Sequence, residues 1–247
     1  MSVALAIRGL VVRNGNQSLV GGVDLSVSAG EFVALVGESG AGKSLTAWFA
    51  LGGVPPGLDV EYEELRINEL RVHSFENREV RKMLRDHVGV VTQNPIQSLD
   101  PQIRIGTQLK RIVGANVDLV QLLSSVELEQ PDTVLGAYPS ELSGGMAQRV
   151  LIAAAIGKPD LRLLIADEPT TGLDVIVQRK ILDLLFRKCG ELGCGMLLVT
   201  HDLRVVSNYC DRVVLLRNGV VEELTDASTF FESPSSEYGR YVLEVSQ

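Results

Sequence analysis

The sequence contains no long apolar run. No stretch of about 18 consecutive apolar residues occurs among its 247 residues, so we expect no helix that crosses a bilayer. Residues 1–15 are interrupted by Arg8 and Arg13, and they lack both a basic first region and a small-residue cleavage site. They therefore do not predict a secretory signal peptide.

The sequence also has few cysteines and carries no net positive charge. The three cysteines, Cys189, Cys194 and Cys210, show neither even pairing nor the spacing of metal ligands. We expect them to be buried or incidental thiols in a reducing compartment. The formal net charge of −8 argues against an extended nucleic-acid-binding face, so no nucleic-acid partner is expected.

The composition is that of a globular domain, with 45% apolar and 22% charged residues. Short apolar runs alternate with segments of helical pattern, which predicts a parallel sheet covered by helices. The runs that we expect to form its strands are residues 31–36, 88–93, 161–166, 196–200 and 212–216.

Two other segments follow different patterns. Residues 3–12 and 22–27 alternate apolar with polar side chains, which predicts an antiparallel layer. Residues from about 94 to 142 are helical and rich in loops. We therefore predict a single α/β domain over residues 1–247. Its parts are a catalytic core with the β subdomain (1–92 and 143–247) and an inserted helical subdomain (94–142).

A phosphate-binding motif follows the first of the parallel strands. Residues 37–44, GESGAGKS, fit the pattern G-x-x-x-x-G-K-[ST] between a strand and a helix, which is typical of a P-loop NTPase core. Its glycines let the backbone wrap around phosphate oxygens. We expect Lys43 to reach the β- and γ-phosphates and Ser44 to bind Mg²⁺. The expected nucleotide-binding residues are Gly37, Glu38, Ser39, Gly40, Ala41, Gly42, Lys43, Ser44 and Leu45.

Two adjacent acids end another apolar strand. Residues 161–168, LRLLIADE, should deliver Asp167 and Glu168 to the carboxyl edge of the sheet, beside the phosphate loop. Neighbouring carboxylates there need a cation, so we expect Asp167 to hold Mg²⁺. Glu168 is then placed to polarise an attacking water. The alternative, a simple turn or cap acid, is improbable beside a phosphate loop.

Residues 142–149, LSGGMAQR, resemble the signature motif of ATP-binding-cassette (ABC) ATPases. Ser143, Gly144 and Gly145 would open a helix and form a second anion cradle. On its own this pattern is best explained as an ordinary helix cap.

The other motifs of the ABC family follow in order along the chain. Gln93 ends a strand like the family's Q-loop, Asp174 lies in TTGLD like the D-loop, and His201 follows MLLVT like the H-loop. The resemblance implies that two cassettes bind two ATP molecules head to tail. It also implies that Gln93 senses Mg²⁺ and water, that His201 contacts the γ-phosphate, and that Asp174 couples the two sites.

One departure from the family concerns the residue that would stack on the adenine of ATP. The family commonly stacks adenine on an aromatic residue at a position near Asn14, but no Tyr, Trp or Phe occurs between residues 1 and 31. We expect looser base recognition, with Arg13 as a planar cationic substitute. Val20 and Val23 are the alternative apolar contacts.

The segments QNPIQSLDP (93–101) and YPSELSGGMAQR (138–149) look like ATP-binding subunits of bacterial nickel and peptide importers. This resemblance implies two membrane-spanning permease subunits, a second ATP-binding subunit (more often a paralogue, giving a heterodimer) and, indirectly, an extracytoplasmic substrate-binding protein. It places the chain at the cytoplasmic face of the inner membrane, with residues 94–110 in the groove for the permeases. The cargo would be nickel, a metal chelate or an oligopeptide. The absence of a longer, cysteine-containing tail favours the nickel type.

Three alternatives remain. A soluble ABC ATPase acting on ribosomes or nucleic acid typically carries two cassettes or a long coiled coil, and neither pattern occurs here. A regulatory cassette would be expected to lack Glu168 or His201. An exporter cassette is often fused to a membrane domain.

Overall fold

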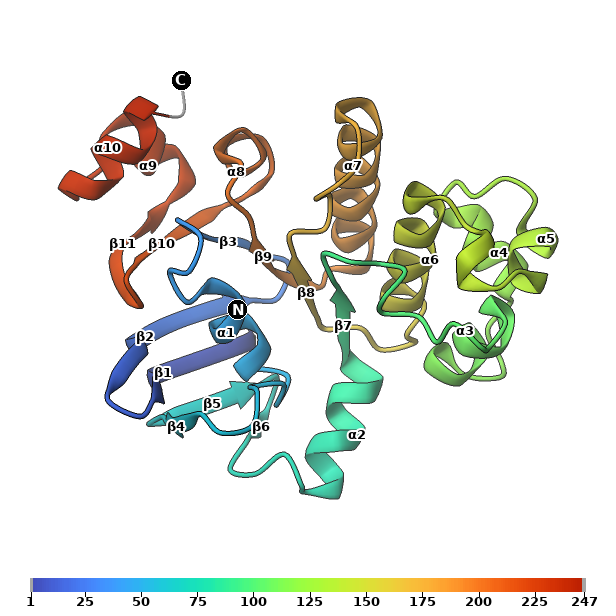
Figure 1. Ribbon diagram of the computed structural model, residues 1–247, viewed down its shortest axis with the longest axis horizontal. Helices are drawn as coiled ribbons and strands as arrows, with labels where there is room; N and C mark the ends of the chain where they lie inside the picture. The colour runs from blue at the N-terminus through green and yellow to red at the C-terminus, as the bar shows by residue number, and fades with distance from the viewer. Residues whose placement is uncertain (1, 246–247) are drawn as a thin grey trace. The chain divides into compact units, whose positions relative to one another are not determined.

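The computed structural model describes residues 2–245. It divides into two compact units, one extending to Arg81 and resuming at Cys194, the other covering Lys82–Gly193. Figure 1 shows the helices and strands of each unit. Among the described residues, no helix combines the length and the apolar character that spanning a bilayer requires.

The first unit begins with an antiparallel sheet in the order β2-β1-β5-β6, with β4 also paired to β1. Its strands are β1 (Val3–Asn14), β2 (Gln17–Ser28), β4 (Asp59–Glu61), β5 (Glu64–Ile67) and β6 (Leu70–Arg71).

The long strand β1 keeps one face buried in spite of a break in its alternation. Leu5, Ile7, Leu10 and Val12 are fully buried, although Ile7 and Leu10 are three residues apart rather than two. The register shifts between these two residues, and Gly9 has a φ of 60° there. This bulge inserts one extra residue, so that Leu10 returns to the core face.

The first unit also contains a largely parallel group of strands in the order β11-β10-β3-β9. β3 (Phe32–Gly37) pairs in parallel with both β9 (Gly195–Val199) and β10 (Arg212–Arg217). β11 (Val220–Asp226) returns antiparallel through a turn in which Asn218 and Gly219 have φ values of 51° and 79°. Positive φ at both residues is the conformation that an Asn-Gly hairpin favours.

Helices cover these strands within the first unit (Figure 1). They are α1 (Lys43–Phe49), α8 (Leu203–Tyr209), α9 (Ala227–Glu232) and α10 (Glu237–Val245). Val36 of β3, Val206 of α8, Phe230 of α9 and Tyr238 of α10 belong to one buried core cluster. The C-terminal helices are therefore part of the core that supports β3.

The second unit has its own two-stranded parallel pair, β7 (Val88–Val91) and β8 (Leu163–Asp167). Its helices are α3 (Ile105–Val113), α4 (Leu119–Ser125), α5 (Pro131–Gly136), α6 (Gly144–Ile156) and α7 (Val175–Leu192), and the chain enters the unit within α2 (Arg78–His87). α6 is buried along most of its length.

The predicted α/β class is confirmed, with an antiparallel layer, parallel strands and covering helices. The segment 94–142 contains α3, α4 and α5 as expected. Its status as a separate inserted subdomain stays a prediction. Cys189 and Cys194 are buried thiols, and burial followed by the charge of Asp211 raises the pKa of Cys210 to about 12.

Packing of β7 against its neighbours predicts a cost for any side chain at Gly89. A Cβ there would lie 2.8 Å from Leu164 Cδ1 and 3.0 Å from the carbonyl oxygen of Ala155. We expect Gly89→Ala to lower the free energy of unfolding in urea by about 1–3 kcal/mol through overpacking. Gly190→Ala is the matched control, because nothing lies within 4 Å of its Cβ position, and it should stabilise α7 by about 0.5–1 kcal/mol. Equal effects would contradict the described packing.

Candidate functional site

The phosphate loop leaves β3 at a point of close backbone contact. Gly37 has a φ of 145°, and a Cβ on it would lie 2.1 Å from the carbonyl oxygen of Leu216 in β10. Gly42 has a φ of 95°, and its Cβ would lie 2.9 Å from the carbonyl oxygen of Leu19. Only glycine fits either position, so the loop can follow this path only with these residues.

Lys43 is folded back onto the loop that precedes it. Its side chain is buried, and Nζ donates hydrogen bonds of 2.8 Å to the carbonyl oxygens of Gly37 and Glu38. Ser44 follows it in α1 and is half-buried, whereas Glu38 is exposed. The structure thus brings the carbonyl oxygens of two predicted loop residues to the ammonium group of Lys43.

His201 lies at the same edge of the strands as the phosphate loop. Leu35 of β3 is opposite Val199 of β9, and the Thr200 amide donates to the Leu35 carbonyl at 3.3 Å. Two residues further along the chain from this pair lie Gly37, the last residue of β3, and His201, just beyond the end of β9. Because the strands are parallel, both emerge at the carboxyl edge, and His201 is exposed there.

In the second unit, β8 ends at the two predicted acids. Asp167 is only 6% exposed. Glu168 adopts a φ of 44°, a left-handed conformation that a non-glycine residue seldom takes. Its Oε2 accepts from Thr171 Oγ1 at 2.9 Å and from Gln93 Nε2 at 3.4 Å. The structure therefore brings Gln93 and Glu168 together, and backbone strain at Glu168 is typical of a functional position.

Thr171 was missed in the sequence analysis. It lies three residues after Glu168, within the turn that follows β8. The signal that could have found it is the hydroxyl residue at this short spacing, because a turn at the end of a strand can fold such a side chain back onto the acid.

The signature and D-loop residues both cap helices of the second unit. Ser143 Oγ accepts from the Met146 amide at 3.2 Å at the start of α6. Asp174 Oδ1 accepts from the Ile176 and Val177 amides, each at 3.1 Å, at the start of α7. The capping role considered for Ser143 is thus present in the structure.

The two capped turns lie close to each other. A Cβ on Gly144 would lie 3.5 Å from Leu173 Cδ2, and one on Gly145 would lie 3.3 Å from Val177 Cγ1. Next to Asp174, Val175 and Ile176 are 79% and 70% exposed. The surface of the second unit around Asp174 thus combines polar side chains that cap helices with exposed apolar side chains.

The residues expected near the base are arranged differently from the prediction. Val20 and Val23 are fully buried, so the expectation that they contact adenine is wrong. Both face the core although they are three residues apart in β2, because the pairing with β1 shifts register opposite Gly21 and Gly22, which lie between them. Arg13 is partly exposed and forms a 3.1 Å ion pair with Glu61. Its role toward the base stays a prediction.

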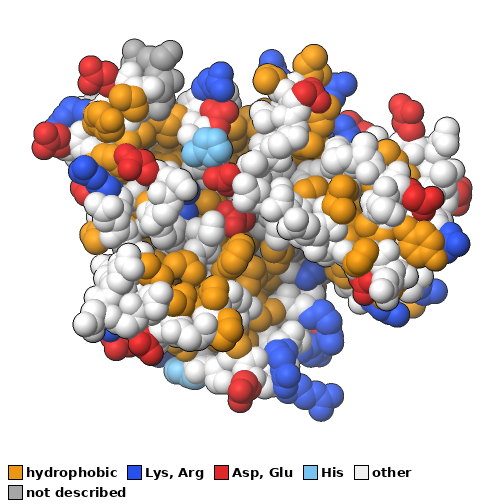
Figure 2. Space-filling view, in the orientation of Figure 1, with side chains coloured by type: hydrophobic (Ala, Val, Ile, Leu, Met, Phe, Trp, Pro, Cys, Tyr) orange, Lys and Arg blue, Asp and Glu red, His pale blue; other side chains and the backbone are white. Residues whose placement is uncertain are grey.

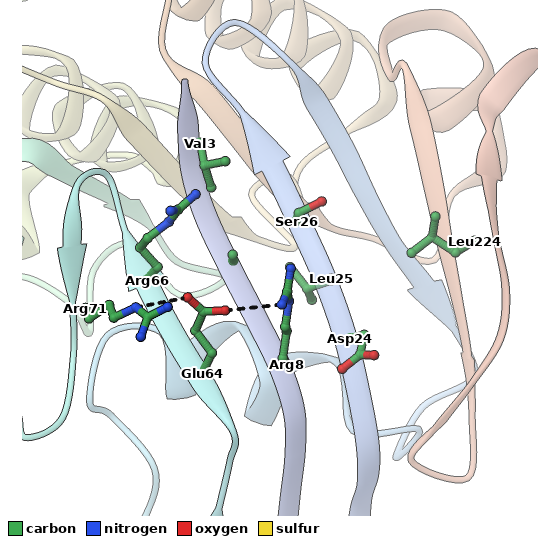
Figure 3. A pocket seen from close by; sticks show the side chains of 10 residues that line it. Val3, Arg8, Asp24, Leu25, Ser26, Glu64, Arg66, Arg71 and Leu224 are labelled. Carbon is green, nitrogen blue, oxygen red and sulfur yellow. Dashed lines mark ion pairs between the residues drawn. The ribbon is translucent and has the colours of Figure 1, made fainter. Parts of the chain in front are cut away.

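A hollow of about 480 Å³ lies on the antiparallel sheet. None of the predicted site residues is among the residues that line it. Figure 3 shows Glu64 between Arg8 and Arg71, at ion-pair distances of 3.6 and 3.4 Å. Asp24 and Arg66 add one charge of each sign to its lining. The charges largely neutralise one another, and the pattern is that of a solvated sheet face.

A second hollow, of about 560 Å³, lies among helices of the second unit. Its lining includes Arg104, Thr133, Tyr138 and Met146. Arg104 donates to the carbonyl oxygen of Gly136 and lies 4.9 Å from the ring centroid of Tyr138. Figure 2 shows hydrophobic side chains at the surface over this group of helices. The hollow combines apolar and polar surface, as docking sites often do.

Comparisons with known proteins identify the same family that the sequence motifs resemble. The family described as "ABC transporter" matches residues 20–171. The oligopeptide transport ATP-binding protein OppD of Lactococcus lactis subsp. cremoris (strain SK11) is 35% identical over 98% of this chain and 73% of its own length. AppD of Bacillus subtilis (strain 168), also an oligopeptide transport ATP-binding protein, is 38% identical over 91% of this chain and 71% of its own.

A solved structure of an ATP-binding cassette is also similar to this chain. A dimeric, post-hydrolysis structure of the ATP-binding cassette MJ0796, bound to ADP and Pi, superimposes with a TM-score of 0.76. It is 27% identical in sequence, and the similarity covers 90% of this chain and 98% of that one.

Proposed function

Because the chain belongs to the ABC transporter family and is an ATPase, we propose that it energises a bacterial importer. The observation that carries this proposal is the arrangement around Glu168. Its carboxylate is held by Thr171 and approached by Gln93, at the end of a buried strand. A regulatory cassette would have no need to keep this acid oriented.

The phosphate loop is the proposed binding site for the triphosphate. Lys43 already places its ammonium among carbonyl oxygens of the loop, so its positive charge is in position for the β- and γ-phosphates. His201, at the same strand edge, would contact the γ-phosphate. Family membership supports assigning these residues and those of the second unit to the same ATP.

Mg²⁺ is the proposed metal, and the residues present fit it. Asp167 is a buried carboxylate at the end of β8, and carboxylate oxygens are ligands that suit Mg²⁺. Among residues 2–245, no group of three or more His, Cys, Asp or Glu side chains could hold a metal. A set of Asp167, the Ser44 hydroxyl and the Gln93 amide, completed by phosphate oxygens and water, suits Mg²⁺, which keeps several such ligands. When bound, the metal would neutralise phosphate charge.

Glu168 is the proposed general base. Thr171 donates a hydrogen bond to the Glu168 carboxylate, and Gln93 donates to the same oxygen atom. These two bonds fix the Glu168 side chain. A water that contacts both Gln93 and Glu168 would be oriented for attack on the γ-phosphate, and positioning of this kind supplies most of the catalysis in phosphoryl transfer.

A second cassette is proposed to complete the site. The exposed Val175 and Ile176 beside Asp174 form an apolar surface that a partner would cover. Ser143, Gly144 and Gly145 would then face the partner's phosphate loop. We propose a paralogous partner, two membrane-spanning permeases and an indirect substrate-binding protein, with the chain bound at the cytoplasmic face of the membrane.

The names of the relatives support oligopeptides as cargo, since two of them are oligopeptide transport ATP-binding proteins. Nickel or a metal chelate is the second proposed cargo class, supported by the resemblance of residues 93–101 and 138–149 to subunits of nickel and peptide importers. Uptake of labelled peptide and of ⁶³Ni by the assembled importer separates the two.

Glu168→Gln tests the proposed chemistry in the complex assembled with the permeases and the partner cassette. We expect ATP turnover to fall by about 100-fold or more, because the base is lost while MgATP binding is retained. Glu129→Gln, an exposed acid of the same unit, is the control and should keep full turnover. Unchanged turnover in Glu168→Gln would show that the partner cassette carries out hydrolysis and that this chain is regulatory.

The hollow between α3, α5 and α6 is the proposed contact for the permeases. Arg104 lines it, but its contacts with Gly136 and Tyr138 hold the local structure, so its substitution would disturb folding as well as docking. Thr133 is exposed and lines the same hollow. We expect Thr133→Arg to reduce co-purification with the permeases at least several-fold, and Gln121→Arg on α4 to leave it unchanged. Equal recovery of both variants would refute this placement.

A further inference from the structure

We propose that Gln178, in the first turn of α7, is a positioning residue for Glu168. Its side-chain amide holds the turn formed by residues 168–174, here named the Glu168 turn, and Thr171 of this turn holds the Glu168 carboxylate. The inference rests on the proposed function, in which Glu168 activates the attacking water. Gln178 lies in none of the motifs that were predicted to bind or hydrolyse ATP.

The Glu168 turn connects β8 to α7 and has a flexible apex. The Thr171 amide donates to the Glu168 carbonyl at 3.2 Å, and the Leu173 amide donates to the Thr170 carbonyl at 3.3 Å. Gly172 has a φ of 79°, and no atom of the described residues lies within 4 Å of its Cβ position. Glycine allows the backbone much freedom at this point, so the shape of the turn depends on additional bonds.

The Gln178 side chain supplies two such bonds. Its Nε2 donates to the Thr170 carbonyl at 3.2 Å and to the Leu173 carbonyl at 3.0 Å. Both partners are carbonyl oxygens, so the nitrogen of the amide faces the turn, and both of its protons are used. Because Thr170 and Leu173 flank Thr171 and Gly172, the two bonds fix the turn on either side of the Thr171 side chain.

The helix that carries Gln178 is itself well anchored. The Gln178 amide donates to the Asp174 carbonyl at 2.8 Å, which places the residue in the regular first turn of α7. Further along the same helix, Ile181 and Leu185 are fully buried. A helix packed into a dense core moves little, so Gln178 provides a fixed point for the Glu168 turn.

Thr171 transmits this restraint to the acid. Its Oγ1 donates to Glu168 Oε2 at 2.9 Å, and Gln93 donates to the same oxygen at 3.4 Å. The φ of 44° at Glu168 is one that a non-glycine residue seldom adopts, so the surroundings must impose it. The orientation of the Glu168 carboxylate thus depends on Thr171 and, one step further away, on Gln178.

Gln178→Met tests the proposal, because methionine is unbranched and suits a helix but cannot donate a hydrogen bond. In the importer assembled with the permeases and the partner cassette, we expect kcat for ATP to fall about tenfold, since a shift of the base by less than about 1 Å is enough to misplace the water. KM for MgATP should be unchanged, because the bonds of Gln178 go to the Glu168 turn and not to the phosphate loop.

Gln121→Met is the matched control, since Gln121 is an exposed residue of α4 in the same unit, and it should keep full turnover. Thr171→Val and the Thr171→Val/Gln178→Met double variant complete a double-mutant cycle on kcat. Because Gln178 acts through Thr171, the double variant should be no slower than Thr171→Val alone.

Hydrogen exchange of the folded chain measures the restraint without any hydrolysis. The Thr171 and Leu173 amides, which bond within the Glu168 turn, should exchange faster in Gln178→Met than in the wild type. In Gln121→Met their exchange should be unchanged. Equal exchange of these amides in all three proteins would show that Gln178 does not hold the turn and would overturn the proposal.

The kinetic results can also overturn it. An unchanged kcat in Gln178→Met, a rise in KM at constant kcat, or strictly additive losses in the cycle would each do so. A loss of turnover that only follows the amount of assembled complex would show a purely structural role for Gln178. Full turnover in Glu168→Gln would instead contradict the proposed function, and hydrogen exchange would still decide whether Gln178 holds the turn.

Discussion

The contact between the end of β3 and β10 is the constraint on which the phosphate loop depends. Gly37 approaches the carbonyl oxygen of Leu216 more closely than any side chain would allow, and this fixes the direction in which the chain leaves the strand. Lys43 can then fold back onto the carbonyls of Gly37 and Glu38. The neighbouring strand β9, in parallel register with β3, brings His201 to the same edge. A bound triphosphate would find a preformed cradle.

In the second unit, the structure holds the side chain of Glu168 in one orientation. Glu168 has a left-handed backbone conformation, which costs on the order of 1 kcal/mol and persists only where the surroundings impose it. Here they include Thr171 and Gln93, which both contact the same carboxylate oxygen. In the proposed mechanism, binding of phosphate and activation of water would thus rest on separate sets of residues, each with its own hydrogen bonds.

The sequence predicted those parts of the site that are contiguous. The phosphate loop and the two acids at the end of β8 were predicted because each lies at the end of an apolar strand with a recognisable spacing. Contacts between distant segments were not predicted, such as the close approach of Gly37 to the carbonyl oxygen of Leu216, because no local pattern encodes them. Val20 and Val23 were offered as apolar contacts for the base, whereas a register shift in the pairing of β2 with β1 buries both of them. Likewise, the bulge at Gly9 depends on cross-strand pairing.

The central claim is that the loop around Lys43 binds the terminal phosphates of ATP. The most direct test is to titrate MgATP and AMP into the wild-type chain and into Lys43→Ala, with circular dichroism to verify that both are folded. The account predicts that the wild type binds MgATP at least about tenfold more tightly than AMP, and that Lys43→Ala loses this preference while its affinity for AMP is unchanged. An undiminished preference for MgATP in folded Lys43→Ala would contradict the account.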